Sequence, residues 1–161
     1  AGLDRAALPA LAAGRERDSS AANGSSIAFV LEYAGRRLLL TGDAHPDLLA
    51  ANLARYAARV GEDRARLDLV KLPHHGSRSN VTAELAASWS ASRFLISTDG
   101  SGYAHPDDSA LARLMLAAGA PAEFFVNHPG GGPARWVPHA DALGVRFHLP
   151  DDPAAGIVVD V

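Results

Sequence analysis

The stretch KLPHHGS, residues 71–77, places two histidines side by side between a proline and a glycine, directly after an apolar run. Neighbouring residues on a strand point to opposite faces, and Pro73 and Gly76 both disfavour a helix here. The pattern therefore predicts a tight turn at the end of a strand, with both imidazoles on a short, rigid loop. One ring can then bind a metal ion while its neighbour contacts substrate or donates a proton.

Outward from this turn, apolar strands alternate with helical patterns, which predicts a single α/β layered domain over residues 1–161. A hairpin turn is expected around Gly35. Residues 1–22 form a loop-like lead-in. We expect strands at 25–33, 38–42, 67–72, 93–98, 121–128, within 136–150 and at 156–161, and helices at 43–60, 82–91 and 107–119, the last with a stop at Gly119.

Composition excludes several classes of protein. The 161 residues are 48% hydrophobic and 20% charged, with a net charge of −3 and no cysteine. Disulfides, thiolate zinc sites and cysteine nucleophiles are therefore excluded, and no basic excess is present to hold a polyanion. No apolar run approaches the roughly 20 residues that span a bilayer, and no signal peptide pattern opens the chain, so we expect a cytoplasmic protein.

Candidate metal ligands follow three of the expected strands. Asp43, the pair His74 and His75, and His105 each lie in a loop directly after an apolar segment. The ends of strands are where functional groups gather in layered α/β folds. Each feature alone has an ordinary explanation, since Asp43 could be a helix cap and a lone histidine is more often a surface residue. Together, a carboxylate and up to three imidazoles suit zinc, manganese or iron.

The order of these motifs carries a resemblance to a known family. The segments LLLTGDA, LDLVKLPHHGSRSN and FLISTDGSGYAHP resemble the metallo-β-lactamase superfamily. The nearest branch includes the hydrolase domain of the bacterial competence DNA-uptake channel protein, in which an Asn/Ser segment, here Asn23 to Ser26, also opens the strand before the Gly-Asp. The resemblance covers residues 20–115 and continues more weakly to the end of the chain.

This resemblance implies a four-layer αβ/βα sandwich with a metal site between two sheets. Asp43 would match the aspartate that bridges two zinc ions, with manganese as an alternative, and His105 the late ligand of the second ion. The HHGS pair would supply a ligand to the other ion. His75 is favoured for that role and His74 for substrate contact, but either can bind. A metal-bound hydroxide would attack a phosphoester, nucleic acid included, while His74 or Tyr103 assists the substrate oxygen.

The chain lacks the superfamily's HxHxDH motif, which supplies most ligands of the first metal. The sequence therefore resembles only the C-terminal half of the fold. The apolar strands of such a half need cover, so we expect a partner, either the missing N-terminal half or a second copy, and little activity in isolation. Two alternatives remain. One is a catalytically silent interaction module, and the other is a hydrolase of a lactone, thioester or choline phosphoester.

Overall fold

A computed structural model describes residues 3–118, 121–130, 132–152 and 154–161, and contains a six-stranded and a two-stranded sheet. The large sheet has the order β1-β2-β4-β6-β7-β8. Only β1 runs antiparallel to its neighbour, and the other described pairs are parallel. Its strands are β1 (Phe29–Tyr33), β2 (Arg36–Leu40), β4 (Leu69–Lys71), β6 (Arg93–Ile96), β7 (Glu123–Val126) and β8 (Arg146–His148). The small sheet pairs β3 (Ala65–Arg66) with β5 (Trp89–Ser90).

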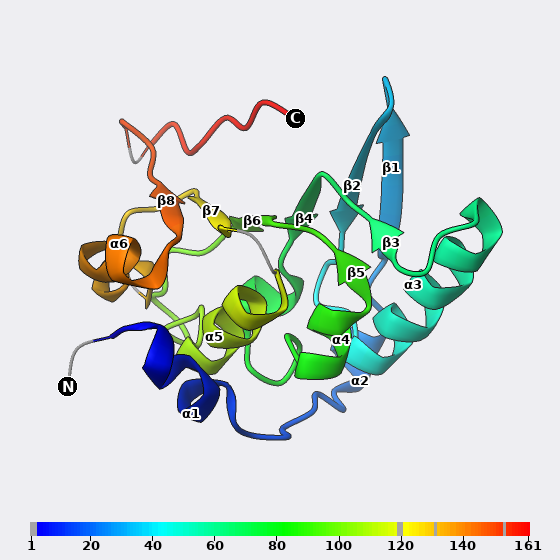
Figure 1. The fold of residues 1–161 in the computed structure, drawn as a ribbon, viewed down its shortest axis with the longest axis horizontal. Helices are drawn as coiled ribbons and strands as arrows, with labels where there is room; N and C mark the ends of the chain where they lie inside the picture. Colours follow the sequence, from blue (N-terminus) through cyan, green and yellow to red (C-terminus); the bar gives the residue numbers. More distant parts are fainter. Residues whose placement is uncertain (1–2, 119–120, 131, 153) are drawn as a thin grey trace.

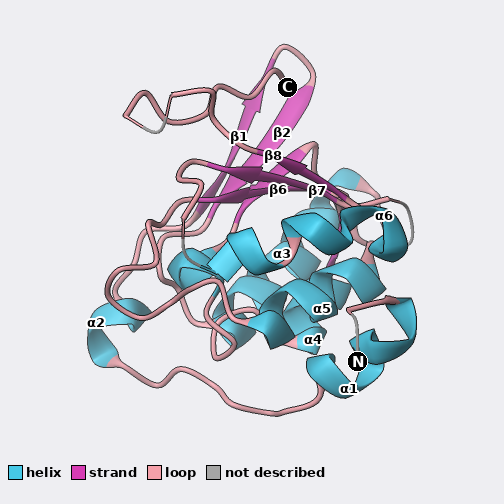
Figure 2. Ribbon diagram, turned by 90° about the vertical axis from the view of Figure 1, so that its left-hand side faces the viewer, coloured by secondary structure: helices cyan, strands magenta, loops and turns pink. Residues whose placement is uncertain are grey.

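The helices lie on one side of the large sheet, and the C-terminal segment passes over the other side (Figures 1 and 2). Arg93 anchors that segment, because its Nη2 donates to the Asp160 carbonyl at 2.6 Å. The helices are α1 (Leu8–Ala12), α2 (Ala21–Gly24), α3 (Pro46–Val60), α4 (Ala83–Ala87), α5 (Asp108–Ala117) and α6 (Ala140–Leu143). The α/β class expected from the sequence is confirmed.

The core forms between the helices and the inner face of the sheet. Alternate strand residues point inward, because side chains on a strand alternate between faces. They pack against helix residues spaced by three or four positions, as the burial of Leu49, Leu53 and Ala57 on α3 illustrates. The buried strand residues include Leu39, Val70, Phe94, Ile96, Phe124 and Val126, and both tryptophans, Trp89 and Trp136, are also buried. Burial of each large apolar side chain contributes about 1.5–3 kcal/mol.

Helix α3 shows how local sequence sets the element boundaries. Pro46 occupies the first turn, where its missing N–H costs no hydrogen bond. Gly61 ends the helix in the left-handed conformation, with φ of 73°, and its N–H bonds back to the last turn. Asp43, which could have capped this helix, lies outside it, because His45 occupies the N-cap position.

Four expectations about secondary structure are wrong or fall outside the description. The lead-in contains α1 and the first half of α2, and Leu8 is fully buried in the core. The helix expected over 82–91 ends at Ala87, because the following residues pair with β3. Residues 156–161 form no strand, and the Arg93 side chain, not a backbone ladder, bonds to this segment at the Asp160 carbonyl. The expected stop at Gly119 lies outside the described residues.

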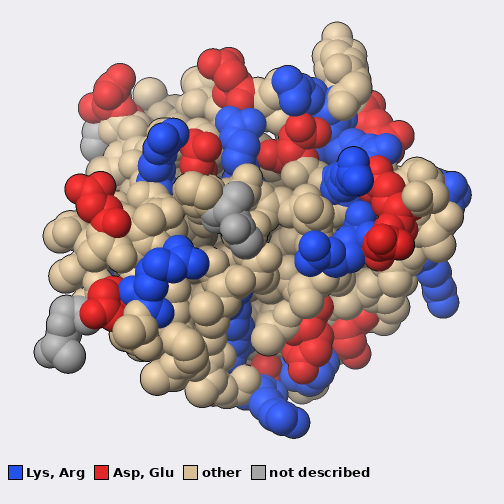
Figure 3. Space-filling view, viewed as in Figure 1, with Lys and Arg blue, Asp and Glu red and all other residues tan. Residues whose placement is uncertain are grey.

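The surface carries mixed charge. On the face shown in Figure 3, Lys and Arg side chains are interspersed with Asp and Glu, as expected from the small net charge. Across the described ranges, none of the helices combines the length and the apolar character that a bilayer crossing requires.

Candidate functional site

The predicted site residues lie at one edge of the large sheet. Because β2, β4 and β6 are parallel, the loops after them meet at their shared carboxyl end. Two backbone hydrogen bonds join these loops. The His74 N–H donates to the Gly42 carbonyl at 3.1 Å, and the Asp107 N–H donates to the Gly76 carbonyl at 3.0 Å. The loops that carry Asp43, the histidine pair and His105 are therefore neighbours in space.

The histidine pair sits on a tight turn, η2 (Pro73–Gly76), with an unusual backbone. His74 has φ/ψ of 44°/48° and His75 of 56°/19°, both in the left-handed region. This conformation costs about 1–3 kcal/mol for a residue with a side chain, so surrounding contacts must hold it. The two ring centroids lie 6.2 Å apart. The expected tight turn after a strand is confirmed, and it follows β4 directly.

His75 is oriented by a backbone carbonyl. Its Nδ1 lies 2.5 Å from the Ser97 oxygen, in the loop after β6. A carbonyl oxygen only accepts hydrogen bonds, so the His75 Nδ1 carries a proton and donates it. In the neutral ring the Nε2 lone pair then stays free for a metal ion or a substrate proton.

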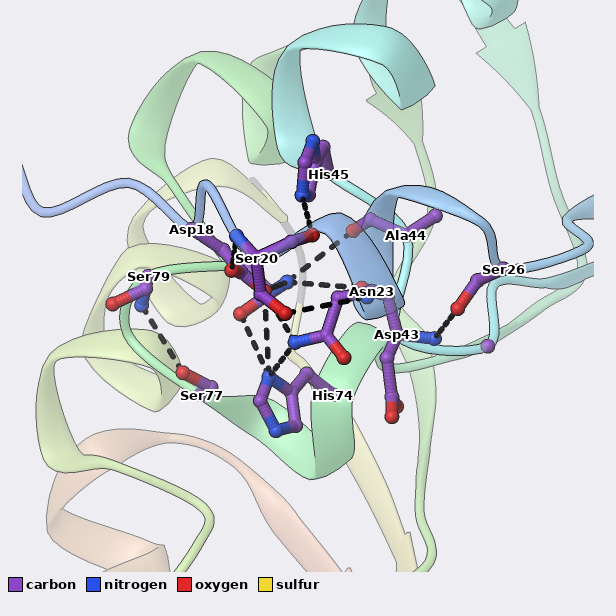
Figure 4. A network of polar contacts seen from close by, with 12 residues as sticks. Asp18, Ser20, Asn23, Ser26, Asp43, Ala44, His45, His74, Ser77 and Ser79 are labelled. Atoms are coloured by element: carbon purple, nitrogen blue, oxygen red, sulfur yellow. Dashed lines mark hydrogen bonds and ion pairs between the residues drawn. The ribbon is translucent and has the colours of Figure 1, made fainter.

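His74 contacts a polar network that reaches the N-terminal segment (Figure 4). Its Nδ1 lies 3.1 Å from Asn80 Oδ1, 3.3 Å from Asn23 Nδ2 and 3.7 Å from Asp18 Oδ2. The Asp18 side chain is 9% exposed. Its backbone N–H donates to the Ser79 carbonyl at 3.1 Å, which ties this segment to the loop after the histidine turn.

The Asp18 carboxyl is held ionised. Burial by itself would raise its pKa, but hydrogen bonds from the Asn23 and Asn80 side chains and from the Ser20 N–H outweigh burial and lower the pKa to about 2. The two amide nitrogens lie 2.6 Å and 2.8 Å from Asp18 Oδ2. A fixed negative charge therefore lies beside the His74 ring at neutral pH.

His105 lies next to His74, with 5.5 Å between ring centroids. Its Nδ1 is buried and 3.5 Å from Asp107 Oδ2, but makes no hydrogen bond. Burial lowers the pKa of His105, although the Asp107 charge partly opposes this, so the ring is neutral near pH 7. The Tyr103 ring stacks on His105 at 5.9 Å and is 82% exposed. Both predicted residues of this loop therefore border the histidine cluster.

Asp43 has a separate environment. Its N–H donates to Ser26 Oγ at 3.1 Å and its carbonyl accepts from Asn80 at 3.2 Å. In Figure 4 its carboxylate points away from the Asp18 side chain. Burial lowers the pKa of Lys71, and the Asp43 charge opposes that shift, which indicates an electrostatic interaction between the two groups.

The site brings the rings of His74, His75 and His105 together. The Nδ1 atom of each ring has an oxygen atom as a near neighbour, although His105 makes no hydrogen bond through it. Within the ranges that the structure describes, however, no three His, Asp or Glu side chains are placed to hold a metal ion together. The histidine cluster is therefore a partial donor set, and the zinc site with Asp43 as a shared ligand stays a prediction.

Sequence reasoning missed Asp18 and Asn80 as members of the site. Asp18 lies in the segment RERDSS, which has no periodicity and no motif. Asn80 is fully buried although asparagine is usually exposed, and the sequence carries no signal for that burial. Asn23 was noted only as part of the Asn/Ser segment. Folding, and not local pattern, joins these residues to the histidine turn.

No family model, curated protein or solved structure matches this chain. The fold and the geometry of the histidine cluster are therefore the observations from which a function can be inferred.

Proposed function

We propose that the chain is a metal-dependent hydrolase that acts on phosphoesters, with nucleic acid among the substrate classes. The observation that carries this proposal is the convergence of three imidazoles at the carboxyl edge of the sheet, with ring centroids 5.5 and 6.2 Å from that of His74. Imidazoles whose Nδ1 atoms face oxygen atoms are a recurrent arrangement of metal ligands, because the contact orients the ring. Zinc is the favoured ion, with two ions in the complete fold and manganese as an alternative.

Each residue then has a defined role. His75 and His105 are the favoured ligands, since His75 has its Nδ1 proton held by a carbonyl and His105 is neutral near pH 7. A bound metal would supply a hydroxide at neutral pH. His74 and Tyr103 border the cluster and would contact the substrate oxygen, although His74 could also bind the ion. Because the described side chains form only a partial donor set, further ligands would come from a partner, either an N-terminal half or a second copy.

Metal content tests this proposal directly. We expect the protein, after incubation with zinc and dialysis, to retain metal in emission spectroscopy. His75→Ala and His105→Ala should each weaken zinc affinity about 10- to 100-fold, while His139→Ala, outside the cluster, should not. The isolated chain should hydrolyse bis(p-nitrophenyl) phosphate only weakly, and this weak activity should fall further in the same two variants and in Asp43→Ala. Wild-type protein with less than about 0.2 zinc per chain would contradict the proposal, and hydrolysis of a lactone or thioester alone would favour the other hydrolase class.

A second candidate, a non-enzymatic interaction module, is favoured by the outer face of β1. This strand is at the edge of the sheet and its backbone can accept another strand. Apolar side chains at alternate positions are exposed on this strand and just before it: Ile27 by 82%, which precedes β1, and Phe29 by 49%, Leu31 by 44% and Tyr33 by 78% within it. An apolar stripe of this kind on an edge strand is typical of an interaction surface.

Self-association through this stripe is testable by light scattering after size exclusion. We expect the wild-type chain to form a dimer as its concentration rises. The double variant Phe29→Lys with Leu31→Lys should raise the protein concentration at the midpoint of dimerisation at least about tenfold, because it places charge on the apolar stripe. Leu116→Lys, at an exposed apolar position on α5, is the matched control. A wild-type chain that stays monomeric at every concentration would exclude the second copy as the partner.

A further inference from the structure

The buried side chain of Asn80 lies against the Nδ1 atom of His74. Asn80 Nδ2 lies 2.8 Å from Asp18 Oδ2, 3.2 Å from the Asp43 carbonyl and 3.3 Å from the Ala44 carbonyl. All three neighbours are acceptors, so they face the amide NH₂ group. The amide oxygen of Asn80 therefore faces His74 Nδ1, at 3.1 Å, and can only accept a hydrogen bond.

Asp18 contributes the shortest of the three Asn80 amide contacts and adds a negative charge beside the His74 ring. Its carboxylate accepts hydrogen bonds from Asn80 and from the Asn23 side chain, and lies 3.7 Å from His74 Nδ1. With a proton on Nδ1, the ring presents an N–H to the Asn80 oxygen at 3.1 Å and to the Asp18 carboxylate. The Asn23 amide nitrogen also lies near this atom, at 3.3 Å, but its shorter contact, at 2.6 Å, is with Asp18 Oδ2. With the proton on Nε2 instead, the Nδ1 lone pair could accept only from the Asn23 amide at 3.3 Å. It would also face the Asn80 oxygen and the Asp18 negative charge, and both of these contacts would be repulsive.

We propose that Asp18 is a positioning residue that acts through Asn80 to keep the His74 proton on Nδ1, which leaves the Nε2 lone pair free for a metal ion or a substrate proton. The inference rests on the proposed function for the use of that lone pair, but the position of the proton is independent of it. It also gives the N-terminal segment a role, because residue 18 reaches the histidine turn from outside the strand-end loops.

His75 supplies an internal control. Its Nδ1 proton is donated to the Ser97 carbonyl, which Asp18 does not contact. Both histidines of the turn should therefore be in the same tautomer in the wild-type protein. A different acceptor holds the Nδ1 proton of each ring. Only one of the two should respond to a change at position 18.

The test is NMR of the metal-free protein with isotope-labelled histidine, at a pH where the imidazoles are neutral, with the His74 signals assigned by comparison with His74→Gln. We expect wild-type His74 and His75 to be almost entirely in the Nδ1–H form. Asp18→Ala removes one of the three acceptors of the Asn80 amide and the negative charge beside Nδ1, and it should shift His74 measurably toward the Nε2–H form that a free imidazole favours, while His75 stays unchanged. Asp18→Asn, which keeps the shape of the side chain should Asp18→Ala not fold, should shift His74 in the same direction by less.

Two results would overturn the inference: a wild-type His74 already in the Nε2–H form, or a His74 tautomer that neither variant changes. Zinc binding by the wild-type protein is measured in parallel. If wild-type protein retains no zinc while the tautomer shift is observed, the proposed function fails and the positioning role stands. If zinc binds and the tautomer does not respond, the reverse holds.

Discussion

Replacing Arg113 with methionine is expected to destabilise the protein by about 3–5 kcal/mol. The Arg113 side chain on α5 is 1% exposed. Its guanidinium donates to the backbone carbonyls of Ala12, Gly14, Arg78 and Val81, at distances from 2.7 to 3.1 Å. Methionine has a similar length but no donor, so these carbonyls would lose a hydrogen bond that little water can replace. The midpoint of urea denaturation measures the loss.

Arg55→Met is the matched control, because Arg55 is exposed on α3. We expect it to change the free energy of unfolding by no more than about 0.5 kcal/mol. Arg113 also joins the N-terminal segment to the loop after the histidine turn, so limited proteolysis of Arg113→Met should cut residues 12–20 faster than in the wild type. A variant as stable as Arg55→Met would show that the guanidinium contacts are dispensable.

Gly76→Ala is expected to have the second large effect, which is a decrease of about 2–4 kcal/mol in the free energy of unfolding. Gly76 has φ of +88°, and a Cβ atom there would lie 2.6 Å from Pro106 Cβ and 3.2 Å from Pro106 Cα. Since the clash involves a proline and its backbone, the neighbour cannot rotate away. The turn and the loop that carries His105 would have to separate, so zinc binding should also weaken. Thermal unfolding and zinc titration measure the two effects.

Gly35→Ala separates the conformational cost of a positive φ from the steric clash with Pro106. Gly35 has a similar φ of +78°, but nothing lies within 4 Å of a Cβ built there. Its alanine variant should therefore lose only the conformational part, about 1 kcal/mol. Equal decreases in the free energy of unfolding for Gly35→Ala and Gly76→Ala would mean that the close approach of the histidine turn to the His105 loop adds nothing to the cost of the Gly76 substitution.

Much of the fold was predictable because its signals are local. The β1–β2 hairpin follows from a glycine turn between two apolar runs, and α3 from a proline start, a periodic apolar face and a glycine stop. The lead-in was not predictable in the same way. Its helices are short and have little periodicity, and α1 is held by tertiary contacts through the buried Leu8 and the Arg113 hydrogen bond to Ala12.

For the candidate site, the strand-end pattern was enough to identify the side chains that follow the strands: Asp43, the histidine pair and His105. Parallel strands bring their carboxyl ends to one edge, so a pattern of apolar run and polar loop is enough to predict neighbours. The tertiary structure alone decided that Asp18 and Asn80 join His74 and that the Asp43 carboxylate points away from Asp18. Side-chain direction and hydrogen-bond partners depend on distant backbone, here 62 positions apart between Asp18 and Asn80, and no local pattern encodes them.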